Sequence, residues 1–138
     1  MTLHQAAMAF AAGFVSVLIF HQGVWALYAA IGKAPGPAWN REPVPPFGVP
    51  AVLSSAFWGG LWGIVLALLL PIAAPAMGYW PAAIVLGALM TSLVALMVVA
   101  PLKGRPFAGG WKPSIWVFAL SVNAAWAFGT GLLLRLLR

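Results

Sequence analysis

AAMAFAAGFVSVLIFHQGVWALYAAI occupies residues 6–31 and contains no Lys, Arg, Asp or Glu. A helix rises about 1.5 Å per residue and the hydrocarbon core of a bilayer is about 30 Å thick, so this stretch is long enough to span a membrane. Three more charge-free stretches follow, at residues 50–72, 80–100 and 115–134. The sequence therefore predicts an all-α fold, a four-helix transmembrane bundle that forms a single integral membrane domain over residues 1–138.

The composition excludes most soluble folds and most catalytic chemistry. Hydrophobic residues make up 64% of the chain and charged residues 6%, whereas soluble domains carry about 25% charged residues. There is no cysteine, and Glu42 is the one acidic residue. Paired carboxylates and thiolate ligands are impossible within one chain, so we expect no enzyme activity and no metal site. His4 and His21 lie on one helix and cannot ligate one haem iron, which leaves only a haem between two subunits; we expect no cofactor.

The net charge of +6 indicates an anionic partner. The basic residues lie in loops and at one terminus rather than on one face, which favours anionic lipid headgroups over nucleic acid. We expect Lys103, Arg105 and Lys112, in the loop between the third and fourth stretches, to make these headgroup contacts. No nucleic-acid binding is expected.

The connections predict the topology and orientation. Only about seven residues separate the second and third stretches, so these helices are expected to be antiparallel neighbours in an up-down bundle with both termini on one side. Pro71, Pro75 and Pro101 are expected to end helices. The side with both longer loops carries five basic residues, and the side with the termini carries Arg135 and Arg138. This distribution predicts a multi-pass protein of the bacterial inner membrane, with cytoplasmic loops and periplasmic termini.

Small residues recur at spacing four and therefore share helix faces. In lipid, such faces let helix backbones approach closely, which supplies van der Waals contact. The spacing predicts packing seams in a tight bundle, formed between helices of one chain or against a second copy of it. On the second and third stretches the seam residues are Ser55, Gly59, Gly63, Ala67, Ala83, Gly87, Thr91 and Ala95.

Three polar residues fall at one depth. His21, Ser92 and Asn123 each lie within about 4 Å of the midpoint of their helix, displaced toward the longer loops. Polar groups at this depth find partners or face a cavity. One interpretation is an interhelical hydrogen-bond cluster that stabilises the bundle. The other is a small polar cavity in which His21 carries a proton or binds a ligand.

The aromatic residues also allow two interpretations. Trp58, Trp62 and Trp126 lie deep in their helices, where they serve packing or line a pocket. The loop residues Trp39, Asn40, Arg41 and Glu42 combine polar and aromatic chemistry. Arg41 and Glu42 are either an ordinary solvated pair or part of a Pro-rich segment that folds back over the bundle as a lid or a docking surface for a partner.

FHQGVWALY at residues 20–28, PAWNREPVPPFGVP at 37–50 and SSAFWGGLWGIVLALLLP at 54–71 carry a resemblance. The pattern resembles a family of small four-span bacterial inner-membrane proteins without an assigned activity. The resemblance implies four spans and no particular chemistry. Small multidrug-resistance transporters are similar in size but use a Glu in the first helix, where this chain has His21 and Gln22.

Two classes of function follow. The leading hypothesis is a structural or accessory subunit of a homo-oligomer or larger membrane complex, because the chain has few catalytic groups and many close-packing seams. The alternative is a small channel or transporter, or a lipid- or quinone-binding protein, that uses the polar layer around His21.

Overall fold

The computed structural model describes residues 1–137, so the predicted contribution of Arg138 to the orientation lies outside the described residues. The fold is 79% helical, and the described residues form four helices that are long and apolar enough to cross a membrane, which confirms the all-α four-helix bundle. The first span joins α1, a π-helical segment η1 and α2; the second is α3; the third joins α4, a second π-helical segment η2 and α5; the fourth is α6. Their bounds are Leu3–Ser16, Val17–His21, Gln22–Ala30, Ala51–Met77, Tyr79–Val94, Ala95–Val99, Ala100–Leu102 and Pro113–Leu136.

The prediction that Pro71 and Pro75 end the second helix is wrong. α3 continues through both prolines to Met77 and ends at Gly78, whose φ of +87° suits glycine. A proline removes one backbone hydrogen bond and bends a helix, but neighbouring helices make this tolerable inside a membrane. Pro101 lies in α5, and the third span ends one residue later, at Leu102, close to the predicted end. Gly78 alone separates α3 from α4, so the expected loop of about seven residues is a single-residue turn.

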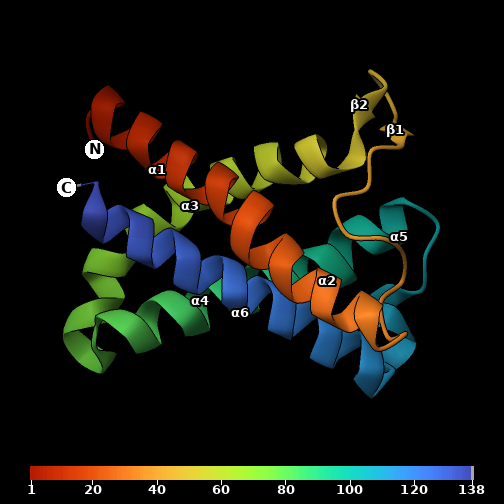
Figure 1. Cartoon of the computed structure of the whole chain (residues 1–138). Coiled ribbons are helices and arrows are strands. Elements are labelled where there is room, and N and C mark those ends of the chain that lie inside the picture. The colour runs from red at the N-terminus through yellow and green to blue at the C-terminus, as the bar shows by residue number, and fades with distance from the viewer. Residues whose placement is uncertain (138) are drawn as a thin grey trace.

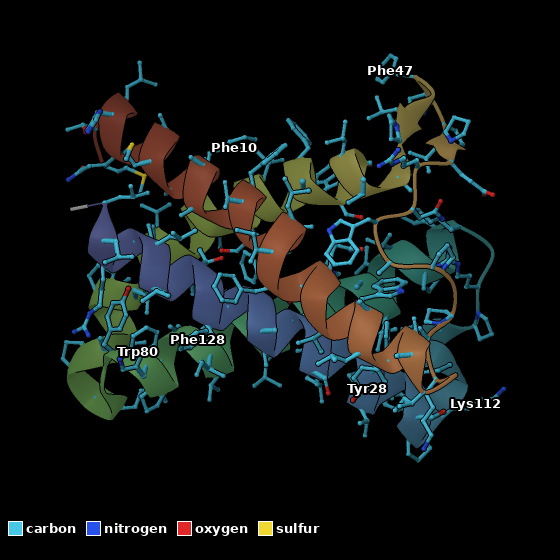
Figure 2. The ribbon with its side chains drawn as sticks, in the orientation of Figure 1. Phe10, Tyr28, Phe47, Trp80, Lys112 and Phe128 are labelled. Atoms are coloured by element: carbon cyan, nitrogen blue, oxygen red, sulfur yellow. The ribbon has the colours of Figure 1, made fainter. Side chains whose placement is uncertain are left out.

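The four spans alternate in direction, and both ends of the described chain lie on the same side of the bundle (Figure 1). α1 packs along α3 and α4 packs along α6, while α6 also contacts α1 and η1. The loop side holds an antiparallel hairpin of β1 (Pro43–Val44) and β2 (Val49–Pro50), which pairs Val44 with Val49. Figure 2 shows Phe47 at the tip of this hairpin, and its side chain is 88% exposed. The second loop contains a 3-10 segment, η3 (Phe107–Trp111).

Glycines bring α1 and α3 into backbone contact. A methyl group built on Gly13 would collide with the carbonyl of Gly59 and lie 3.0 Å from the Cα of Gly63. The indole Nε1 of the buried Trp126, on α6, donates to the carbonyl oxygen of Gly13 at 3.0 Å. Three spans therefore meet at Gly13, where van der Waals contact and one interhelical hydrogen bond act together.

A second seam joins α4 to α6. Gly87 faces Ala127, and a methyl group built on Gly131 would lie 3.2 Å from the Cβ of Ala83. Beside this seam, Trp80 stacks on Phe128 with ring centroids 5.2 Å apart; both residues are labelled in Figure 2. Arg135 places its guanidinium 4.3 Å from the centroid of the Tyr79 ring. The fourth span is thus held to the third along most of its length.

We expect Gly13→Ala to destabilise the bundle by about 1–3 kcal/mol, because the added methyl group meets rigid backbone. The control is Gly23→Ala in the same span, where an added methyl group has no neighbour within 4 Å. Both changes favour the helix by roughly 1 kcal/mol, so their difference isolates the collision. Unfolding by a denaturing detergent, followed by circular dichroism, measures it. Equal midpoints for the two variants would contradict close backbone packing at Gly13.

Candidate functional site

A groove of about 560 Å³ opens between α3 and the end of the third span, on the loop side of the bundle. One wall is α3, with the exposed Ser55, Trp58 and Leu61. The floor includes Val17 from η1 and Trp126 from α6. The opposite wall comes from α4 and η2, and Lys103 closes the loop-side end. The groove is lined by His21, Ser54, Ser55, Thr91, Lys103, Asn123, Val17, Trp58, Gly59, Leu61, Trp62, Val65, Val94, Ala95, Val99 and Trp126.

Both π-helical segments border this groove. Val17 and His21 are the first and last residues of η1, and Ala95 and Val99 are the first and last residues of η2; all four line the groove. A π turn widens the helix and shifts the side chains that follow it, and such turns occur frequently at functional sites. The two segments thus re-aim side chains toward one shared space.

The structure brings two members of the predicted polar layer into contact. The amide Nδ2 of Asn123 donates to the hydroxyl of the fully buried Ser92 at 2.9 Å. That bond uses one of the two amide donors of Asn123. Asn123 lines the groove together with His21, whereas Ser92 lies behind it. The layer is therefore both an interhelical hydrogen bond and part of a groove wall.

His21 is held by a chain of hydrogen bonds that begins in the first loop. The backbone N–H of Trp39 donates to Gln22 Oε1 at 2.7 Å, which fixes the orientation of the Gln22 amide. Its Nε2 then faces His21 Nδ1 at 3.1 Å and donates to it. A neutral imidazole that accepts at Nδ1 carries its proton on Nε2. His21 therefore lines the groove as a ring with an Nε2–H donor.

The first loop folds back against the first span. The indole Nε1 of Trp39 donates to the carbonyl of Leu18, inside η1, at 2.8 Å. Trp25 donates from its indole to the carbonyl of Gly36 at 2.9 Å. The carbonyls of Asn40 and Glu42 accept the backbone N–H groups of Val52 and Ala51, both at 2.9 Å. The loop thus satisfies donors at the start of α3, where no side-chain cap is present.

The remaining predicted residues divide between the seams, the groove and the loop surface. Gly59, Gly63, Ala83 and Gly87 are buried in the helix seams, and Thr91, which donates to the carbonyl of Gly87, is also buried. The ends of the two stripes, Ser55 and Ala95, are exposed on opposite walls of the groove. Ala67 lines a different pocket. Arg41, Glu42, Lys103, Arg105 and Lys112 are exposed on the loop side, and of these only Lys103 lines the groove.

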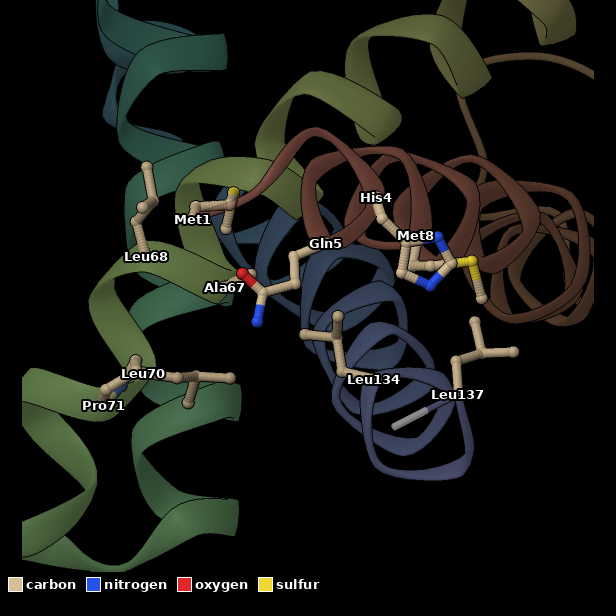
Figure 3. A pocket seen from close by; sticks show the side chains of 10 residues that line it. All are labelled: Met1, His4, Gln5, Met8, Ala67, Leu68, Leu70, Pro71, Leu134 and Leu137. Carbon is tan, nitrogen blue, oxygen red and sulfur yellow. The ribbon is translucent and has the colours of Figure 1, made fainter.

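The pocket that Ala67 lines, of about 680 Å³, lies on the side of the termini. Figure 3 shows side chains from the start of α1, the second half of α3 and the end of α6 around it. Its polar side chains are His4 and Gln5, and Gln5 is already engaged by the N-cap Thr2. The groove concentrates more polar groups and is the better candidate site.

Sequence reasoning did not identify Gln22, Thr91 and Lys103 as residues that share a site with His21. Gln22 carried a signal, because an amide inside a span requires a partner. The contribution of Lys103 depends on where η2 and α5 place the end of the third span, which hydropathy does not encode. Comparison with protein-family models, with curated proteins and with solved structures finds no match.

We expect Gln22→Ala to loosen the first loop, because the variant loses the acceptor for the Trp39 N–H. A hydrogen bond worth about 1 kcal/mol corresponds to a roughly fivefold faster amide exchange over residues 33–49. Hydrogen exchange by mass spectrometry measures this. Gln5→Ala, the same change in the exposed cap of α1, is the control. Equal exchange of the loop in both variants would show that Gln22 does not anchor it.

Proposed function

We propose that the protein binds a lipid-like amphiphile in the groove between α3 and the end of the third span. The observation that carries the proposal is the distribution of lining groups. Lys103 and the Ser54 and Ser55 hydroxyls lie toward the loop end, while Trp62 and Val65 lie further along α3 toward the bilayer centre. An amphiphile has the same order of groups along its length. The volume of about 560 Å³ is within the range of small-molecule sites.

The walls of the groove suit a hydrocarbon chain or a flat ring. Trp58, Trp62 and Trp126, the three deep tryptophans, all line it. The exposed side chains on both walls leave it open sideways, so a ligand enters from the bilayer without crossing water. His21 and Asn123 supply polar contacts at intermediate depth. This arrangement supports the lipid- or quinone-binding alternative, while the structural or accessory subunit and the homo-oligomer stay predictions.

We expect Ala95→Phe to weaken binding by about tenfold or more, because the ring fills the groove and about 1.4 kcal/mol of lost contact is a factor of ten. Native mass spectrometry of the protein in mild detergent, titrated with a phospholipid, measures the one-to-one complex. Val98→Phe, also on η2 and exposed but outside the groove, is the control. Equal loss in both variants, or no one-to-one complex with the unaltered protein, would refute the proposal.

We further propose that the protein lies in the bacterial inner membrane with both longer loops in the cytoplasm. Lys33, Arg41, Lys103, Arg105 and Lys112 lie on the loop side, and cytoplasmic ends of spans carry such an excess.

The chain has no cysteine, so single cysteines report the orientation cleanly. Leu3→Cys and Phe47→Cys replace side chains that are 87% and 88% exposed, on opposite sides of the bundle. A membrane-impermeant maleimide is expected to label Leu3→Cys in cells with a permeabilised outer membrane. It is expected to label Phe47→Cys only after the inner membrane is broken. The reverse pattern would invert the proposed orientation.

A further inference from the structure

The loop end of the groove carries hydrogen-bond donors and one positive charge. Lys103 contributes an ammonium group, and Ser54 and Ser55 contribute hydroxyls from the first turns of α3. Further in, the network that begins at Trp39 leaves the His21 Nε2–H as a donor. Among the described residues that line the groove there is no carboxylate. A negatively charged group is therefore favoured at this end, and a cationic one is disfavoured.

The chain cannot neutralise this charge from its own side chains. It has seven Lys and Arg residues against one acidic residue, Glu42. Glu42 lies beside the hairpin of the first loop, on the same side as Lys103 and the four other loop cations. Five positive charges on that side therefore have one carboxylate as counter-charge. Lys103 directly follows α5, at the level where a span leaves the hydrocarbon, and its side chain is exposed. The phosphate layer of a bilayer is the source of anions at that depth.

We propose that the amphiphile in the groove is an anionic phospholipid whose phosphate end lies at Lys103, Ser54 and Ser55. This inference rests on the proposed function and adds to it the charge of the ligand. The acyl part then lies along Trp62 and Val65, and acceptor oxygens of the lipid face the His21 Nε2–H. Lys103 acts as a binding residue at a defined site, in contrast to Arg105 and Lys112, which touch headgroups only as part of a basic surface.

The test compares phosphatidylglycerol with phosphatidylcholine of identical acyl chains, by native mass spectrometry of the one-to-one complex in mild detergent. We expect the unaltered protein to prefer phosphatidylglycerol by about fivefold, as one lysine near a headgroup is worth about 1 kcal/mol. Lys103→Gln is expected to remove that preference. Lys112→Gln, which removes the same charge on the same side but outside the groove, is expected to keep it.

Further arms separate the possible failures. Ala95→Phe is expected to weaken both lipids to the same extent, which places the bound phosphatidylglycerol in the groove. Glycerol phosphate without acyl chains is not expected to compete, and competition by it would overturn the assignment to a lipid. Equal losses in Lys103→Gln and Lys112→Gln, or no preference in the unaltered protein, would overturn the inference while leaving the groove as a lipid site. If neither lipid binds, the proposed function itself fails.

Discussion

Close backbone contact between the first two spans is the constraint on which the rest of the structure depends. In a bilayer, burial of apolar side chains gives little drive for association, so helices associate through van der Waals packing and interhelical hydrogen bonds. Gly13, Gly59 and Gly63 remove the side chains that would hold the backbones apart. A side chain on Gly59 would also crowd the indole nitrogen of Trp126, which donates to the Gly13 carbonyl. That bond links α6 to the contact between α1 and α3.

The groove is a consequence of how the seams are distributed. α3 packs mainly against α1, and α4 packs mainly against α6. A single residue joins α3 to α4 at the side of the termini. Toward the loop side, α3 and α4 pack against different helices. The space that opens between them is bordered by η1 and η2, where both odd spans depart from α-helical geometry. The groove therefore has the same origin as the two helix seams.

The number of spans, their order and the central residues of the small-residue seams could be predicted from the sequence, because each depends on local composition or on residues four apart. The shared depth of Ser92 and Asn123 could also be predicted, since helix rise is nearly constant. The true end of α3 could not, because neighbouring helices decide whether Pro71 and Pro75 are tolerated. The π-helical segments and the anchoring of Trp39 on Gln22 depend on contacts between segments brought together only by folding. The groove depends on both.

The bond from Trp39 to Leu18 has a consequence for biosynthesis. The acceptor carbonyl lies within the first span, but its indole donor is 21 residues further along the chain. Gln22, also in that span, accepts a hydrogen bond from the backbone N–H of the same tryptophan. The hydrogen bonding of the first span is therefore complete only once the first loop has been synthesised and has folded back against it. Until then the Leu18 carbonyl lacks its indole donor and the Gln22 amide oxygen lacks the Trp39 N–H.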